Sequence, residues 1–100
     1  MGDMMTLVKL RKGEVALVEE KISPRALAAG KMVKDLPLPQ DCTLAAVIRK
    51  DAVLAVRGET VLQPGDEVLA VVSSQQQAAL AALLGPPPNR RQPARAPAKP

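Results

Sequence analysis

Few side chains in this sequence could carry out bond-making chemistry. The 100 residues include one cysteine, Cys42, and no histidine, tyrosine, phenylalanine or tryptophan. A Ser-His-Asp or Cys-His pair is therefore impossible, and a zinc site is excluded in practice. No histidine or lysine lies within two residues of Cys42 to activate its thiol. The residues predict no catalytic site, no metal, no cofactor and hence no enzyme.

The charged residues offer weak binding signals. Glu19 and Glu20 could hold a divalent cation, but neighbouring carboxylates on a strand point to opposite faces. Lys31, directly after Gly30, could meet an anion at the start of a short helix. A solvated lysine is the simpler interpretation.

Two further charges stand at predicted ends of strands. Arg49 ends an apolar run and could bind an anion, although an ion pair with a nearby acid explains it as well. Asp66 follows Gly65 in the turn Gln63–Asp66. Turn chemistry, with the carboxylate accepting hydrogen bonds from nearby backbone amides, is the simpler function of this Asp.

The net charge of +4 is confined to one end of the chain. Residues 85–100 contain four basic side chains, no acid and six of the ten prolines, so residues 1–84 carry no net charge. This composition predicts a disordered Pro/Arg-rich tail over 85–100. Residues 1–11 are predicted to be a disordered lead-in or an extension added in cloning. One small domain over 12–84 remains. Its neutrality and lack of aromatics argue against a nucleic-acid partner.

Hydrophobic periodicity predicts the elements of this domain. Residues 43–49 form the clearest strand, with Leu44, Ala46 and Ile48 expected on one face. The closing helix is marked by a capping-box pattern at Ser74 and Gln77. The expected order is a strand at 14–22, a short helical turn to residue 29, a helical segment at 31–36, strands at 43–49, 53–56 and 67–72, and a helix up to residue 84. The fold class is α+β, as strand, short helix, three strands and helix, with a mostly antiparallel sheet.

The ordered set of motifs resembles the TrkA-C or RCK-C domain, the C-terminal lobe of regulator-of-potassium-conductance proteins. The motifs are Ser23 through Leu36 with Gly30-Lys31-Met32-Val33 inside it, Ala46-Val47-Ile48-Arg49, and Thr60 through Val68 with its Gly65-Asp66. The resemblance covers about residues 12–84. It implies a TrkA-C-like fold and a regulatory domain of a potassium or cation transport system. Such a domain is cytoplasmic and peripheral to the inner membrane through its partner, a membrane transporter subunit.

The resemblance also implies a homodimer that binds a small nucleotide-type ligand in a cleft between two copies. The residues expected to line this cleft are Leu38, Pro39, Leu44, Ala46, Ile48 and Arg49. Members that bind cyclic di-AMP tend to have an Arg after the Leu-x-apolar segment, where this chain has Pro39. The loss of a charge-assisted phosphate contact argues against cyclic di-AMP.

A DNA-binding protein of the AbrB type, built from swapped hairpins, is the alternative. Leu10 through Glu14 and Gln63 through Val68 resemble turn-then-strand pieces of that family. The electrical neutrality of residues 1–84 argues against it, since DNA binding needs a basic face.

Overall fold

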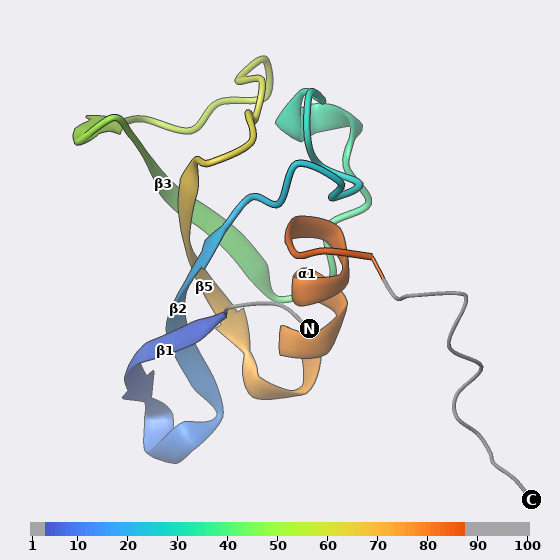
Figure 1. Cartoon of the computed structure of the whole chain (residues 1–100). Helices are drawn as coiled ribbons and strands as arrows, with labels where there is room; N and C mark the ends of the chain where they lie inside the picture. Colours follow the sequence, from blue (N-terminus) through green and yellow to red (C-terminus); the bar gives the residue numbers. More distant parts are fainter. Residues whose placement is uncertain (1–3, 88–100) are drawn as a thin grey trace, which may run out of the picture.

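The computed structural model describes residues 4–87 (Figure 1). The predicted tail over 85–100 lies outside the described residues from position 88 onward. The strands are β1 (Met5–Leu10), β2 (Val15–Lys21), β3 (Cys42–Arg49), β4 (Ala52–Leu54) and β5 (Glu67–Ser73). The helices are the 3-10 turns η1 (Arg11–Gly13), η2 (Val33–Asp35) and η3 (Ser74–Gln76), and the α-helix α1 (Gln77–Leu84).

The five strands form one sheet in the order β1-β2-β5-β3-β4, and every neighbouring pair is antiparallel. The predicted α+β class with a mostly antiparallel sheet is confirmed. The expectation of a disordered lead-in over 1–11 is wrong for residues 5–10, which form β1 at the sheet edge. All six residues of β1 are exposed. A strand that buries none of its side chains does not need the alternation of apolar and polar residues by which a half-buried strand is recognised in a sequence.

One face of the sheet carries the core. Along β2 and β5 every second residue is buried, and these residues point to the same side. In Figure 1, α1 and the segment between β2 and β3 lie on one side of the sheet. The largest apolar side chains in the core, all at most 1% exposed, are Ile22, Leu62, Leu80 and Leu84. Burial of aliphatic surface between this face and α1 is therefore the main stabilising contribution.

A β-bulge in β3 changes the predicted facing of its residues. The register with β5 shifts between Leu44, which pairs with Ala70, and Ala46, which pairs with Leu69. Because the bulge inserts one extra residue, the alternation of faces is interrupted there. Leu44 and Val47 both point into the core, while Ala46 points to the opposite face. The prediction of one common face for Leu44, Ala46 and Ile48 is therefore wrong.

Two tight turns connect neighbouring segments of the chain. Lys50 and Asp51 connect β3 to β4 with positive φ at both positions, as a type I′ hairpin turn requires. In the turn Gln63–Asp66, the Asp66 N–H donates to the Gln63 carbonyl at 3.0 Å. Gly65 has a φ of +89° there, which suits the third position of a type II turn.

The segment between β2 and β3 contains less helix than predicted. Residues 24–30 form turns, and only η2 is helical within 31–36. Here the backbone bonds to the loop before β5 instead. The Gly30 N–H donates to the Leu62 carbonyl at 2.7 Å, and the Val33 N–H to the Thr60 carbonyl at 2.9 Å. These long-range bonds replace the local bonds that would continue a helix.

The predicted capping box at Ser74 is also wrong. The Ser74 hydroxyl donates to the Gly13 carbonyl in the connection between β1 and β2, and Ser74 itself is the first residue of η3. No side-chain cap closes the start of α1, whose N-cap residue is Gln76. Ser74 therefore bonds to the distant β1–β2 hairpin instead of capping the start of α1.

Candidate functional site

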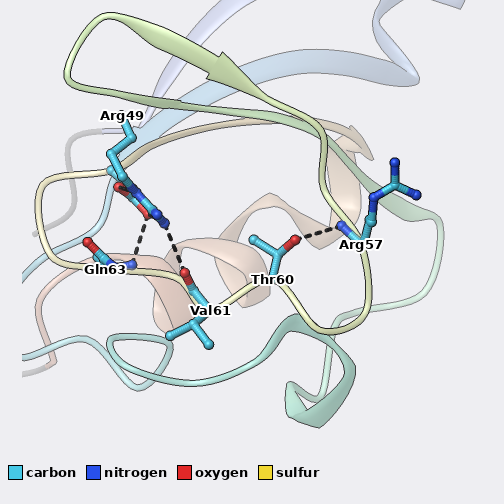
Figure 2. Close-up of polar contacts among 6 residues, drawn as sticks. Arg49, Arg57, Thr60, Val61 and Gln63 are labelled. Atoms are coloured by element: carbon cyan, nitrogen blue, oxygen red, sulfur yellow. Dashed lines mark hydrogen bonds and ion pairs between the residues drawn. The ribbon is translucent and has the colours of Figure 1, made fainter.

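A hydrogen-bonded polar cluster joins the end of β3 to the turn before β5. Asp66 is 1% exposed and receives two hydrogen bonds from Arg49, from Nε to Oδ1 at 2.9 Å and from Nη2 to Oδ2 at 2.8 Å. The Gln63 N–H also donates to Oδ2 at 2.9 Å. Figure 2 shows Arg49 reaching across the loop to the Val61 carbonyl, with which Nη2 makes a further bond of 2.9 Å. Two parallel bonds of this kind fix both distance and orientation.

The cluster connects four parts of the chain. Arg49 belongs to β3, and Asp66 directly precedes β5. The backbone of Asp66 bonds to Ile22 after β2, since the Ile22 N–H donates to the Asp66 carbonyl at 2.7 Å. Val61 forms an isolated antiparallel bridge with Met32. The ion pair therefore holds together the end of the sheet at which the long connections cross.

A second, smaller turn is visible in the same close-up. The hydroxyl of Thr60 accepts a hydrogen bond from the Arg57 N–H at 2.9 Å, and the Thr60 N–H donates to the Arg57 carbonyl at 3.1 Å (Figure 2). These reciprocal bonds shape the loop that presents Val61 to Arg49. This turn has a structural role that follows from the local sequence, because a Thr hydroxyl readily bonds nearby backbone amides.

Arg49 lowers the pKa of Asp66 below its ordinary value of 3.8 by hydrogen bonding to the carboxylate, and the Gln63 amide acts in the same direction. Burial opposes this effect and does not overcome it. The same bonds raise the pKa of Arg49. Asp66 is therefore ionised at neutral pH. Because its side chain is nearly inaccessible, its role is structural: it joins the end of β3 to the turn before β5.

Because the pKa of Asp66 is lowered, acidic pH is expected to destabilise the domain. Asp66 binds a proton less tightly in the folded state than in the unfolded state. The stabilisation that ionised Asp66 provides is therefore fully present above its unfolded pKa of about 4. We expect the free energy of unfolding to decrease as pH falls below about 4 and to keep decreasing until the folded pKa is passed. Urea unfolding at a series of pH values measures this. Asp66→Asn should show a shallower decrease, and parallel curves for the two proteins would contradict the assignment.

The six predicted cleft residues do not lie on one surface of a single copy. Leu44 is buried in the core, and the Arg49 side chain is engaged with Asp66. Leu38 is half-buried and packs against the core, and Pro39, next to it, is also half-buried. The remaining two, Ala46 and Ile48, point to the opposite face of the sheet.

The other sequence candidates are placed as follows. Glu19 and Glu20 point to opposite faces, as expected, and Glu20 is buried on the core face. The Lys31 ammonium donates to the Leu27 carbonyl at 3.1 Å. Burial raises the pKa of the Cys42 thiol, which lowers its reactivity. Within residues 4–87, no three side chains of the His, Cys, Asp or Glu type gather into a metal site.

The opposite face of the sheet is mostly apolar and is left open. Cross-strand pairs on it join Val8, Leu17, Val71 and Thr43 in one row, and Met5, Glu19, Leu69 and Ala46 in the next. These side chains are exposed or half-buried. The sequence predicted the strand at 14–22, but it could not show that one face of the sheet stays uncovered.

Comparison with known proteins identifies the family. The family model described as the TrkA-C domain matches residues 17–85, more than half of the chain. The chain belongs to the TrkA-C domain family. It is a regulatory domain of the kind found in potassium transport systems. This is a different family from the AbrB type that the sequence left open as an alternative.

Individual relatives agree with this membership. This chain is 34% identical over 70 residues to the Trk system potassium uptake protein TrkA of Mycobacterium tuberculosis. The aligned residues make up 70% of this chain and 32% of that protein. This chain is also 37% identical over 67 residues to a TrkA homolog of Archaeoglobus fulgidus, covering 67% of this chain and 15% of that protein. The chain thus spans about a third or less of the length of these curated relatives.

Solved structures show the same fold. The GsuK RCK domain superposes with a TM-score of 0.72 at 21% identity, over 88% of this chain and 19% of that one. A structure described as an RCK domain with cda gives a TM-score of 0.56 at 18% identity, over 66% of this chain and 96% of that one. The predicted resemblance to TrkA-C or RCK-C is confirmed. None of the helices within residues 4–87 has the length and hydrophobicity to cross a membrane.

Proposed function

We propose that the chain is the ligand-sensing lobe of a potassium or cation transport system and controls a membrane channel, transporter or antiporter. It acts as a cytoplasmic homodimer, held near the inner membrane by its transporter partner, and not as an enzyme. The observation that carries this proposal is the TrkA-C match over residues 17–85. The names of the relatives, Trk system potassium uptake proteins, support potassium as the transported ion.

Such a lobe acts by shifting the equilibrium between different arrangements of two copies. A ligand that binds one arrangement of two copies more tightly favours that arrangement and biases the attached gate. A domain that transmits such a bias must move as a rigid body. The pair between Arg49 and Asp66 supports this, because it fixes the connections at one end of the sheet.

The proposed ligand is a small nucleotide-type molecule bound between two copies. The residues proposed to line its cleft remain Leu38, Pro39, Leu44, Ala46, Ile48 and Arg49. Within one copy, Leu38 and Pro39 lie before β3, whereas Ala46 and Ile48 lie on the open face. Leu44 is buried in the core of each copy, so a cleft built from the other residues must combine surfaces of two copies. Cyclic di-AMP is disfavoured because Pro39 offers no charged contact to phosphate.

A melting-temperature screen tests the ligand. Nucleotides, cyclic dinucleotides and metal ions are added separately, and a ligand at about 100 times its Kd should raise the midpoint by about 10 °C or more. Leu38→Lys should abolish the shift, whereas Leu27→Lys, at a residue that is 58% exposed outside the proposed cleft, should keep it. If no compound shifts the midpoint, the ligand-sensing part of the proposal is wrong.

A further inference from the structure

One surface at an end of the domain combines basic side chains with exposed aliphatic ones. It is formed by two segments, 25–35 and 57–62, and is called the loop surface below. The Gly30 N–H donates to the Leu62 carbonyl at 2.7 Å, and the Leu62 N–H donates to the Lys31 carbonyl at 3.0 Å. Figure 1 shows both segments at the top of the molecule, at the end opposite the η1 turn. The backbone bonds hold the two segments together as one surface.

The loop surface has an excess of positive charge. Its six charged side chains are all exposed. They are four bases, Arg25, Lys31, Lys34 and Arg57, and two acids, Asp35 and Glu59. Two further acids at this end of the sheet, Glu19 and Glu67, point with Lys21 to the open face. The loop segment between β2 and β3 lies on the other side of the sheet (Figure 1), so these acids do not neutralise its excess.

Two aliphatic side chains of the loop surface are left exposed among these charges. Leu27 is 58% exposed and Val61 is 38% exposed. The Lys31 ammonium donates to the Leu27 carbonyl at 3.1 Å, so a base lies directly beside this leucine. Protein segments that lie on a membrane bind through buried apolar area together with the attraction of their bases to anionic lipids. The loop surface offers both contributions.

The basic end of the chain starts beside the loop surface. The Ala28 N–H donates to the Leu83 carbonyl at 3.0 Å, which joins this surface to the end of α1. Pro86, just after α1, lines a hollow together with Ser23. From residue 88 onward the sequence contains four bases and no acid. A negatively charged partner on the loop surface is therefore also within reach of these four charges.

We propose that the loop surface docks on an anionic lipid bilayer, with Leu27 and Val61 entering the headgroup region and the surrounding bases contacting lipid phosphates. Direct lipid contact goes beyond the proposed function, in which the transporter partner holds the domain near the membrane. A nucleic acid would also present phosphates. It offers no apolar environment for Leu27 and Val61, and the sequence has no aromatic side chain on which single-stranded bases could stack.

Co-sedimentation of the full chain with lipid vesicles tests this proposal. Vesicles of phosphatidylcholine and phosphatidylglycerol in equal parts should bind the protein, whereas vesicles of phosphatidylcholine alone should not. Binding should weaken as salt is added, because exposed charges are screened. Lys31→Gln with Lys34→Gln should lower the partition coefficient by about twentyfold, since each base near an anionic membrane contributes about fivefold.

Lys9→Gln with Lys12→Gln is the matched control for this loss. It removes the same charge from two exposed lysines near the other end of the sheet. Because charges more than about 10 Å from the bilayer are largely screened at ordinary salt, the partition coefficient should fall by less than about threefold.

Leu27→Ala tests the apolar part of the contact. Shortening this side chain should lower the partition coefficient by about tenfold, because it removes aliphatic area that the bilayer would bury. Leu10→Ala makes the same change at a leucine that is 41% exposed and directly precedes η1, and it should leave binding unchanged.

The outcomes decide between the bilayer and other partners. A protein that binds neither kind of vesicle, or both equally, would overturn the proposal. Wild-type binding by both the Lys31/Lys34 and the Leu27 variants would also overturn it, because residues 88–100 would then make the contact without the loop surface. Binding to duplex DNA but not to vesicles would show that the bases meet a nucleic acid instead. The vesicles contain neither transporter nor nucleotide, so each of these failures leaves the proposed function standing.

Discussion

Replacing Asp66 with alanine is expected to lower the free energy of unfolding by about 3 kcal/mol. The substitution removes a carboxylate that is 1% exposed and that accepts three hydrogen bonds, two from Arg49 and one from the Gln63 amide. Breaking a buried charged pair by removing one partner typically costs about 3–5 kcal/mol, and we take the lower end because the Arg49 side chain is 27% exposed. Urea unfolding of both proteins at neutral pH measures the loss.

Asp35→Ala is the matched control for this loss. Asp35 is exposed at the end of η2, and its substitution should change stability by no more than about 0.5 kcal/mol. Similar small losses for Asp66→Ala and Asp35→Ala would show that the Arg49–Asp66 pair does not stabilise the junction.

Leu80→Ala is expected to cost about 3 kcal/mol as well, by a different mechanism. Leu80 is 0% exposed and belongs to the face of α1 that packs on the core. Truncating a buried leucine removes transferred apolar area and leaves a cavity, at a cost of about 2–5 kcal/mol. An isolated helix of eight residues is not stable in water, so α1 depends on this packing.

Thermal and urea unfolding of Leu80→Ala, beside Leu27→Ala, tests the docking of α1. Leu27 is 58% exposed, and its truncation should cost less than about 0.5 kcal/mol. If the two leucines prove equally dispensable, the core is not organised around α1 in the way described above.

Much of the fold follows from local signals in the sequence. The turn Gln63–Asp66 is specified by Pro64 and Gly65, which suit its backbone angles, and it is present. The strand predicted at 14–22 corresponds to β2. Asp66 was expected to accept hydrogen bonds from backbone amides, and the Gln63 N–H donates one.

What the sequence could not predict depends on contacts between distant segments. The bulge between Leu44 and Ala46 arises where β3 pairs with β5, and nothing in residues 43–49 alone signals it. Arg49 was expected to form an ion pair with an acid, and it does, but the sequence did not identify its partner, Asp66, which is 17 positions away in the chain. Ser74 bonds to Gly13 and not to its own helix, because the hairpin offers a carbonyl that only the folded chain brings close.

The exposed edge strand β1 was missed for a related reason. A strand that pairs along one edge and buries no side chain leaves no periodic pattern in its sequence. Its apolar residues matter only when the open face is considered as a whole. A surface that spans five strands is a property of the assembled sheet.

Rubidium uptake, as a tracer for potassium, tests the regulatory role most directly. Cells in which the coding segment for residues 17–85 is deleted are compared with cells that regain the wild-type segment. We expect deletion to change the uptake rate by at least about fivefold, the lower end of typical coupling between sites, and the wild-type segment to restore it. Asp35→Ala should restore uptake equally well, while Asp66→Ala should restore it poorly. Uptake that is the same with and without the segment would contradict a role for this domain in cation transport.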